Sequence, residues 1–138
     1  MNTSRLLLAI AAFLIGFSSM AQDVVYVDAS VFPVYGKISE ETNERYERLP
    51  ARLEGVSRKA VWTRGRHSSG LYIRFRSNST SIHVKWESLF NNHYNHMTDI
   101  CTKGLDLYAL VDGKWRFVAP GRPSADGVST YTLARNMT

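Results

Sequence analysis

Two runs of alternating apolar and polar residues flank a short polar segment in the middle of the chain. Residues 71–76 read LYIRFR and residues 81–87 read SIHVKWE, so that every second side chain is apolar. A period of two places these apolar side chains on one face of a half-buried β-strand. The segment 77–80 (SNST) has the composition of a turn. The pattern predicts an antiparallel hairpin, which needs a second layer of structure over its apolar face.

A second pair of alternating runs lies further along the chain. Residues 104–111 (GLDLYALV) and 114–119 (KWRFVA) are separated by Asp-Gly at 112–113, which is a strong signal for a tight hairpin turn. We therefore predict a second antiparallel hairpin. Trp86 and Trp115 are in phase with the apolar residues of their runs. We expect both rings to face the core.

Other segments complete the predicted fold class. Strand-like composition recurs at residues 23–29, 31–38, 60–62 and 128–134. Irregular, polar composition recurs at residues 39–47, 64–70, 87–102 and 120–127. About seven short strands with Gly- and Pro-rich turns predict an all-β protein built as a β-sandwich. The last strand-like stretch runs almost to Thr138 with no return strand, so we expect the sandwich to be incomplete at the C-terminus.

The first residues have the three parts of a secretory signal peptide. Arg5 precedes an almost unbroken apolar run at 6–17, and Ser-Met-Ala at 19–21 forms a small-x-small cleavage site. We predict a signal peptide over residues 1–21 and a single domain over 22–138. The expected location is the periplasm or the extracellular space. No segment after Gln22 is long and apolar enough to predict a membrane span.

Charge and cysteine content argue against nucleic-acid binding and against a disulfide. The formal net charge is +5, but the basic residues are spread along the chain and interleaved with glutamates. Nucleic-acid binding would require a clustered basic stripe or a recognisable module, so none is predicted. Cys101 is the only cysteine, which excludes an internal disulfide. We expect it to be a small buried side chain.

The long polar and aromatic segment 87–102 is the predicted functional loop, because long irregular loops in compact domains are often functional. It contains His93 and His96 at a His-x-x-His spacing. Two histidines in an irregular loop do not supply the three or four converging ligands of a zinc site. We predict no metal and no cofactor, and a metal-dependent enzyme that uses these histidines is the weakest alternative.

Aromatic rings offer a second kind of site, because a ring face can stack on a sugar while polar neighbours bind its hydroxyls. Tyr94 in the loop and Trp62 are the candidates that are not assigned to the core. The candidate substrate-binding residues are therefore Tyr94, His93, His96 and Trp62. No catalytic residue is predicted, since the chain has no Gly-x-Ser-x-Gly, Gly-Asp-Ser or Asp-x-x-His motif.

Several ordered segments resemble one family. They are residues 22–30 (QDVVYVDAS), 77–86 (SNSTSIHVKW), 95–108 (NHMTDICTKGLDLY), 112–124 (DGKWRFVAPGRPS) and 132–137 (TLARNM). They are similar to the N-terminal β-sandwich domain of secreted SGNH/GDSL-type hydrolases of Bacteroidetes-like bacteria. The resemblance covers nearly all of the chain after the signal peptide.

The resemblance implies a jelly-roll-like sandwich that continues beyond Thr138, followed in those enzymes by an α/β domain that carries the catalytic serine and the Asp-x-x-His pair. None of those motifs can be placed here, so this chain resembles an N-terminal fragment of a serine esterase. The expected function is a noncatalytic accessory domain of an exported carbohydrate esterase. Its partner would be an SGNH catalytic domain, in cis or from an adjacent reading frame, with a glycan as a possible ligand. The alternatives are a stand-alone carbohydrate-binding module and an inactive, unstable fragment.

Overall fold

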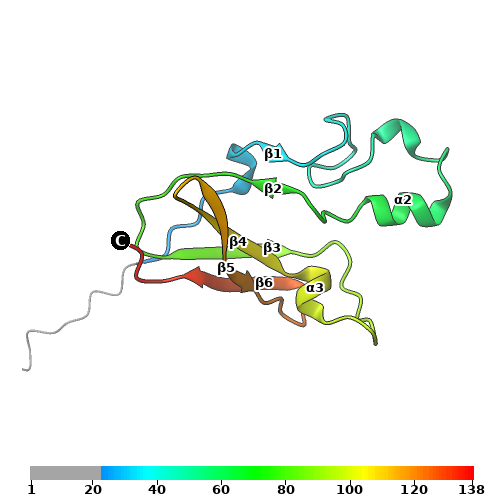
Figure 1. Ribbon diagram of the computed structural model, residues 1–138. Coiled ribbons are helices and arrows are strands. Elements are labelled where there is room, and N and C mark those ends of the chain that lie inside the picture. The colour runs from blue at the N-terminus through cyan, green and yellow to red at the C-terminus, as the bar shows by residue number, and fades with distance from the viewer. Residues whose placement is uncertain (1–22) are drawn as a thin grey trace, which may run out of the picture.

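The computed structural model describes residues 23–138, so the predicted signal peptide lies outside the described residues. Six strands, two α-helices and two 3₁₀ helices (η) make up this part of the chain (Figure 1). In order they are η1 (Ala29–Val31), β1 (Val34–Tyr35), η2 (Ala51–Leu53), α2 (Lys59–Gly65), β2 (Tyr72–Ile73), β3 (Ile82–Glu87), α3 (Asp99–Lys103), β4 (Leu105–Val111), β5 (Lys114–Gly121) and β6 (Val128–Ala134).

The strands form three antiparallel pairs, which confirms the predicted all-β class. β1 pairs with β2, β3 with β6, and β4 with β5. The β4–β5 hairpin lies across the β3–β6 pair, and the contact between the two pairs runs through β5 and β6 (Figure 1). The jelly-roll arrangement stays a prediction. None of the helices within residues 23–138 is long and apolar enough to cross a membrane.

The β4–β5 hairpin is confirmed, together with its two-residue turn. Asp112 and Gly113 have φ angles of 50° and 73°. Positive φ at both central residues is the geometry that matches the twist of two antiparallel strands. The register pairs Tyr108 with Phe117 and Leu110 with Trp115.

The predicted hairpin over residues 71–87 is wrong in its pairing. β2 pairs with β1, where Ile73 lies opposite Val34, and β3 pairs with β6, where Trp86 lies opposite Ser129. The alternation correctly placed Ile82, Val84 and Trp86 on the partly buried face of β3. An alternating pattern fixes which face of a strand is buried, but the pairing depends on the rest of the chain.

Two predicted strands are also wrong. Residues 60–62 belong to helix α2, which contains the good helix formers Lys59, Ala60 and Arg64. The strand propensity of Val and Trp is a weak preference that its surroundings can override. Residues 23–28 are irregular and lead into η1, where the Asp28 carboxylate accepts a hydrogen bond of 2.7 Å from the Ser30 N–H.

The small core lies where β5 crosses the β3–β6 pair. Leu133 is the one large hydrophobic side chain in residues 23–138 that is buried. A Cβ added at Gly121 would lie 3.3 Å from both Leu133 Cδ2 and Trp86 Cη2. Glycine at this position therefore allows the backbone of β5 to pack directly against the Trp86 ring.

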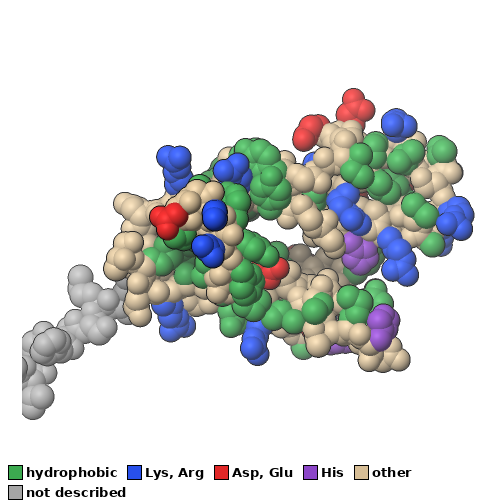
Figure 2. All heavy atoms as spheres, viewed as in Figure 1, with side chains coloured by type: hydrophobic (Ala, Val, Ile, Leu, Met, Phe, Trp, Pro, Cys, Tyr) green, Lys and Arg blue, Asp and Glu red, His purple; other side chains and the backbone are tan. Residues whose placement is uncertain are grey.

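The predicted burial of Trp115 and of Cys101 is wrong. Trp115 is half-exposed, and Cys101 is exposed on α3. The register explains the Trp115 result. Leu107 and Ala109 lie on the face of β4 that is partly covered, whereas Trp115 pairs with Leu110 and therefore lies on the opposite face. Figure 2 shows a band of hydrophobic side chains over the part of the molecule where β4 and β5 lie.

Candidate functional site

Helix α3 closes the predicted functional loop and holds an ion pair. Thr98 precedes the helix in an extended conformation, and Gly104 follows its last residue. Asp99 in the first turn and Lys103 in the last turn are four residues apart, a spacing that brings side chains together on one helix face. The Lys103 Nζ lies 3.2 Å from Asp99 Oδ2. The Lys103 side chain is only 2% exposed, so its charge needs further partners.

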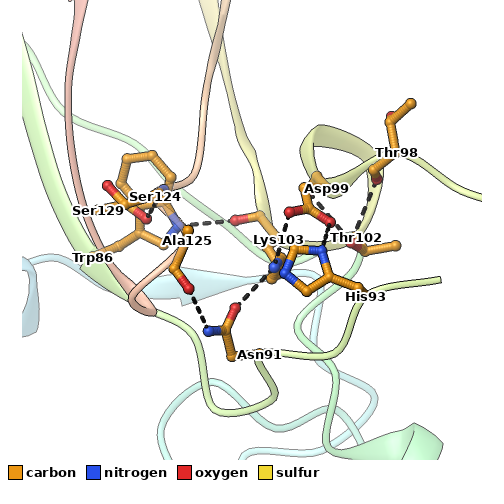
Figure 3. A network of polar contacts seen from close by, with 10 residues as sticks. All are labelled: Trp86, Asn91, His93, Thr98, Asp99, Thr102, Lys103, Ser124, Ala125 and Ser129. Atoms are coloured by element: carbon orange, nitrogen blue, oxygen red, sulfur yellow. Dashed lines mark hydrogen bonds and ion pairs between the residues drawn. The ribbon is translucent and has the colours of Figure 1, made fainter.

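Asn91 supplies the second partner of the buried amine. Lys103 Nζ donates a hydrogen bond of 2.8 Å to Asn91 Oδ1, and Asn91 Nδ2 donates one of 2.9 Å to the Ala125 carbonyl oxygen (Figure 3). The Trp86 Nε1–H also donates to the Lys103 carbonyl oxygen, at 2.8 Å. Lys103 therefore ties the loop to β3 and to the segment before β6.

The segment before β6 is fixed by its own polar contacts. Ser129 is fully buried, and its hydroxyl accepts a hydrogen bond of 2.9 Å from the Ser124 N–H. The Ser88 N–H donates to the Gly127 carbonyl oxygen at 3.1 Å. Both ends of the functional loop are thus anchored, and only its middle part is free to present side chains to solvent.

His93 is the predicted site residue with the best-defined environment. Its Nδ1 lies 2.9 Å from Asp99 Oδ1, and its side chain is 65% exposed (Figure 3). A carboxylate on Nδ1 fixes the ring orientation and leaves Nε2 as the outward acceptor in the neutral ring. A carboxylate orients the catalytic histidine of a serine hydrolase in the same way, and that histidine then acts as a general base on a hydroxyl group near its Nε2. Within residues 23–138, no hydroxyl hydrogen-bonds to this ring.

Tyr94 and His96 lie together at the tip of the loop. Their ring centroids are 5.7 Å apart in an edge-on arrangement, and His96 Nδ1 lies 3.1 Å from Asn95 Oδ1. The turn that carries them is closed by a bridge between Tyr94 and Met97. His93 and His96 therefore have different partners and do not converge on one point.

Trp62 is separate from the other three candidates. It lies half-buried on α2, in a different lobe from the functional loop (Figure 1). Metal ligands do not gather either: no group of three or more His, Cys, Asp or Glu side chains within residues 23–138 could hold an ion. His93, Tyr94 and His96 therefore share the functional loop, where Tyr94 and His96 are in contact and His93 pairs with Asp99, and their role in substrate binding stays a prediction.

The sequence reasoning missed Asn91, Asp99 and Lys103, which hold the loop in place. A signal was present for two of them. Asp99 and Lys103 have the i, i+4 spacing of a helical ion pair, and Thr98 before them is a common helix N-cap residue. Asn91 gave no such signal, because its partners come from distant parts of the chain.

His67 is a further residue of interest, because it connects the lobe that contains α2 to the functional loop. Its ring stacks on Phe90, with centroids 4.9 Å apart and an interplanar angle of 25°. Figure 2 shows that the molecule is hollowed between these two lobes. Partial burial lowers the pKa of His67, and the nearby cations of Arg48 and Arg64 lower it further.

The lowered pKa of His67 predicts a pH-dependent stability. The unfolded chain takes up a proton near the ordinary value of 6.5, whereas the folded protein resists it until a lower pH. The free energy of unfolding should therefore fall as the pH drops from 7.5 to 5. Urea unfolding across this range is expected to show a weaker decrease for His67→Gln. The exposed control His96→Gln should keep the decrease, and an unchanged slope in His67→Gln would contradict the assignment.

The fold and the site together define an antiparallel β domain with a polar loop that is anchored at both ends. The family model GxDLY, described as the N-terminus of SGNH-hydrolase-type esterase, matches residues 24–138. The chain belongs to this family. The letters of the family name occur here as Gly104-Leu105-Asp106-Leu107-Tyr108, directly after Lys103.

The fold is also similar to a crystal structure described as a GDSL-like lipase from Bacteroides ovatus, with a TM-score of 0.76 and 31% sequence identity. The similarity covers 83% of this chain and 34% of the lipase chain, so this chain spans about a third of the length of that protein. No curated protein matches the sequence. These findings confirm the family resemblance.

Proposed function

We propose that this protein is a noncatalytic N-terminal accessory domain of an exported SGNH/GDSL-type carbohydrate esterase, which supports a catalytic domain outside this chain. The match of residues 24–138 to the N-terminal region of such esterases carries the proposal. In the similar lipase, the matching region makes up 34% of the chain, so that chain is about three times as long as the region itself.

The environment of His93 supports a noncatalytic role. Ester hydrolysis by a serine requires a hydroxyl within hydrogen-bond reach of an oriented base. His93 is oriented by Asp99, but no hydroxyl of residues 23–138 hydrogen-bonds to it. The pair can bind a polar group of a substrate or of a neighbouring domain, whereas the nucleophile has to come from elsewhere.

The loop tip supports a carbohydrate as the substrate class. Tyr94 exposes part of its ring beside the amide of Asn95 and the imidazole of His96. A ring face with adjacent hydrogen-bonding groups suits a sugar, which has an apolar C–H face and polar hydroxyls.

The proposed export rests on the signal-like residues 1–21. N-terminal sequencing of the exported protein should therefore give a sequence that begins at Gln22.

A graft tests the accessory role. The full 138-residue chain is purified alone, and residues 22–138 are also grafted in place of the matching third of the Bacteroides ovatus lipase. Release of p-nitrophenol from p-nitrophenyl acetate is measured for both, and for the lipase without its matching third. We expect no hydrolysis by the chain alone, and more active protein from the graft than from the shortened lipase.

Two outcomes would contradict the accessory role. Hydrolysis by the chain alone that is lost in His93→Ala would make it an enzyme in its own right. A graft no more active than the shortened lipase would remove the supporting role. Binding of a xylooligosaccharide by the chain alone, lost in Tyr94→Ala and retained in the control Tyr26→Ala, would favour a stand-alone binding module if the graft were also no more active than the shortened lipase.

A further inference from the structure

One face of the β4–β5 hairpin carries four large apolar side chains that stay half-exposed. Paired residues of an antiparallel ladder lie on the same face of the sheet. Tyr108 and Phe117 form one such pair and Leu110 and Trp115 the next, and Asp106 lies on the same face opposite Pro120. We call Asp106, Tyr108, Leu110, Trp115 and Phe117 the hairpin face.

The hairpin face exposes more apolar surface than a scattered surface residue would. Its four large side chains are each between 50% and 55% exposed. Two of them pack on each other, because the Tyr108 and Phe117 rings are 5.6 Å apart, edge to face. A third, Trp115, is contacted by the Arg74 guanidinium, which lies 5.2 Å from its ring. A contiguous and ordered apolar patch of this kind is typical of a protein interaction site.

The GxDLY segment supports this interpretation, because only some of its residues have a role inside the described chain. Gly104 lies against two backbone carbonyls, and Leu107 is half-buried on the covered face of β4. Asp106 and Tyr108 point to the other face. Both are exposed.

We propose that the hairpin face is the surface on which the SGNH-type catalytic domain docks. The proposal rests on the accessory function above and specifies where the two domains meet. The partner surface would be apolar opposite Leu110, Trp115 and Phe117, and would offer a hydrogen-bond donor or a positive charge to Asp106.

The length of the similar lipase and the position of the C-terminal end both favour a catalytic domain as the partner of the hairpin face. The matching region of the similar lipase is followed or flanked by two thirds of a chain that has no counterpart here. Figure 1 places the C-terminal end of this chain at the same end of the molecule as the β4–β5 turn. A domain attached through that end would therefore begin at the end of the molecule where the β4–β5 turn lies.

Thiol labelling tests whether the face is covered. Cys101 is exposed and is first replaced by serine, so that one introduced cysteine reports alone. Leu110→Cys on the hairpin face and the control Ile38→Cys, at an exposed position in the loop after β1, are made in the full chain and in the graft. The rate of maleimide labelling is measured for each.

We expect Leu110→Cys to react at least about tenfold more slowly in the graft than in the chain alone, while Ile38→Cys reacts at similar rates in both. A Trp115→Asp graft should regain fast labelling of Leu110→Cys. Equal rates for Leu110→Cys in an active graft would overturn the docking face and leave the accessory function standing. Slow labelling in the chain alone that speeds up on dilution would overturn it in favour of a second copy as the partner.

Discussion

Replacing Gly104 by alanine is expected to lower the free energy of unfolding by about 3 kcal/mol. The reason is steric. A Cβ at this position would overlap the Ile100 carbonyl oxygen and would lie 2.9 Å from the Gly121 carbonyl oxygen. Both obstacles are backbone atoms, one at the end of α3 and one in β5, so neither can rotate away. Urea unfolding followed by circular dichroism would measure the loss.

Gly55→Ala is the matched control for this prediction. Gly55 has a φ of +73°, and an added Cβ would meet no atom within 4 Å. Its replacement should cost only the strain of the left-handed backbone, about 1 kcal/mol. Equal losses in the two variants would show that α3 can shift away from β5 at little cost, and would contradict the steric explanation.

Replacing Lys103 by alanine should destabilise the protein by about 2 kcal/mol. The change removes a buried cation and leaves the oxygens of Asp99 and Asn91 without their shared donor. Asp99 is partly exposed and can be rehydrated, which keeps the loss below that of a fully buried pair. The shift in the urea midpoint at constant slope would measure it.

Two further variants separate charge from packing at this site. Lys103→Met keeps an unbranched apolar stem but has no donor, so it should lose nearly as much stability as the alanine variant. Lys114→Ala removes an exposed lysine from the hairpin turn and should change the stability by less than about 0.5 kcal/mol. Full stability of Lys103→Met would mean that packing of the stem, and not the hydrogen bonds, holds the loop.

The sequence predicted the parts of the fold whose signals are local. The β4–β5 hairpin was predicted correctly because Asp112 and Gly113 specify a turn that brings neighbouring strands together. The strand pairing of β3 was not, because its partner β6 follows more than forty residues later. The exposure of Trp115 could not be predicted either, since it depends on which face of the hairpin the β3–β6 pair covers.

The candidate site divides in the same way. The loop and its exposed side chains His93, Tyr94 and His96 were predicted from the loss of strand periodicity and from composition, but its last residues, 99–102, belong to α3. The contacts that hold the loop were not, because Asn91 bonds to Ala125, thirty-four positions away in the chain. Asp99 and Lys103 were within reach of sequence reasoning, as a helical pair, but α3 is too short to show an apolar stripe.

The pairing of β3 with β6 also has a consequence for the order in which the chain can fold. α3 and the β4–β5 hairpin lie between the two strands in sequence, so the pair can form only by closing the loop that contains them. If the hairpin forms first, the effective length of that loop is shorter and the entropic cost of closing it is lower. During synthesis, the backbone edge of β3 that pairs with β6 must stay without this partner until β6 has left the ribosome.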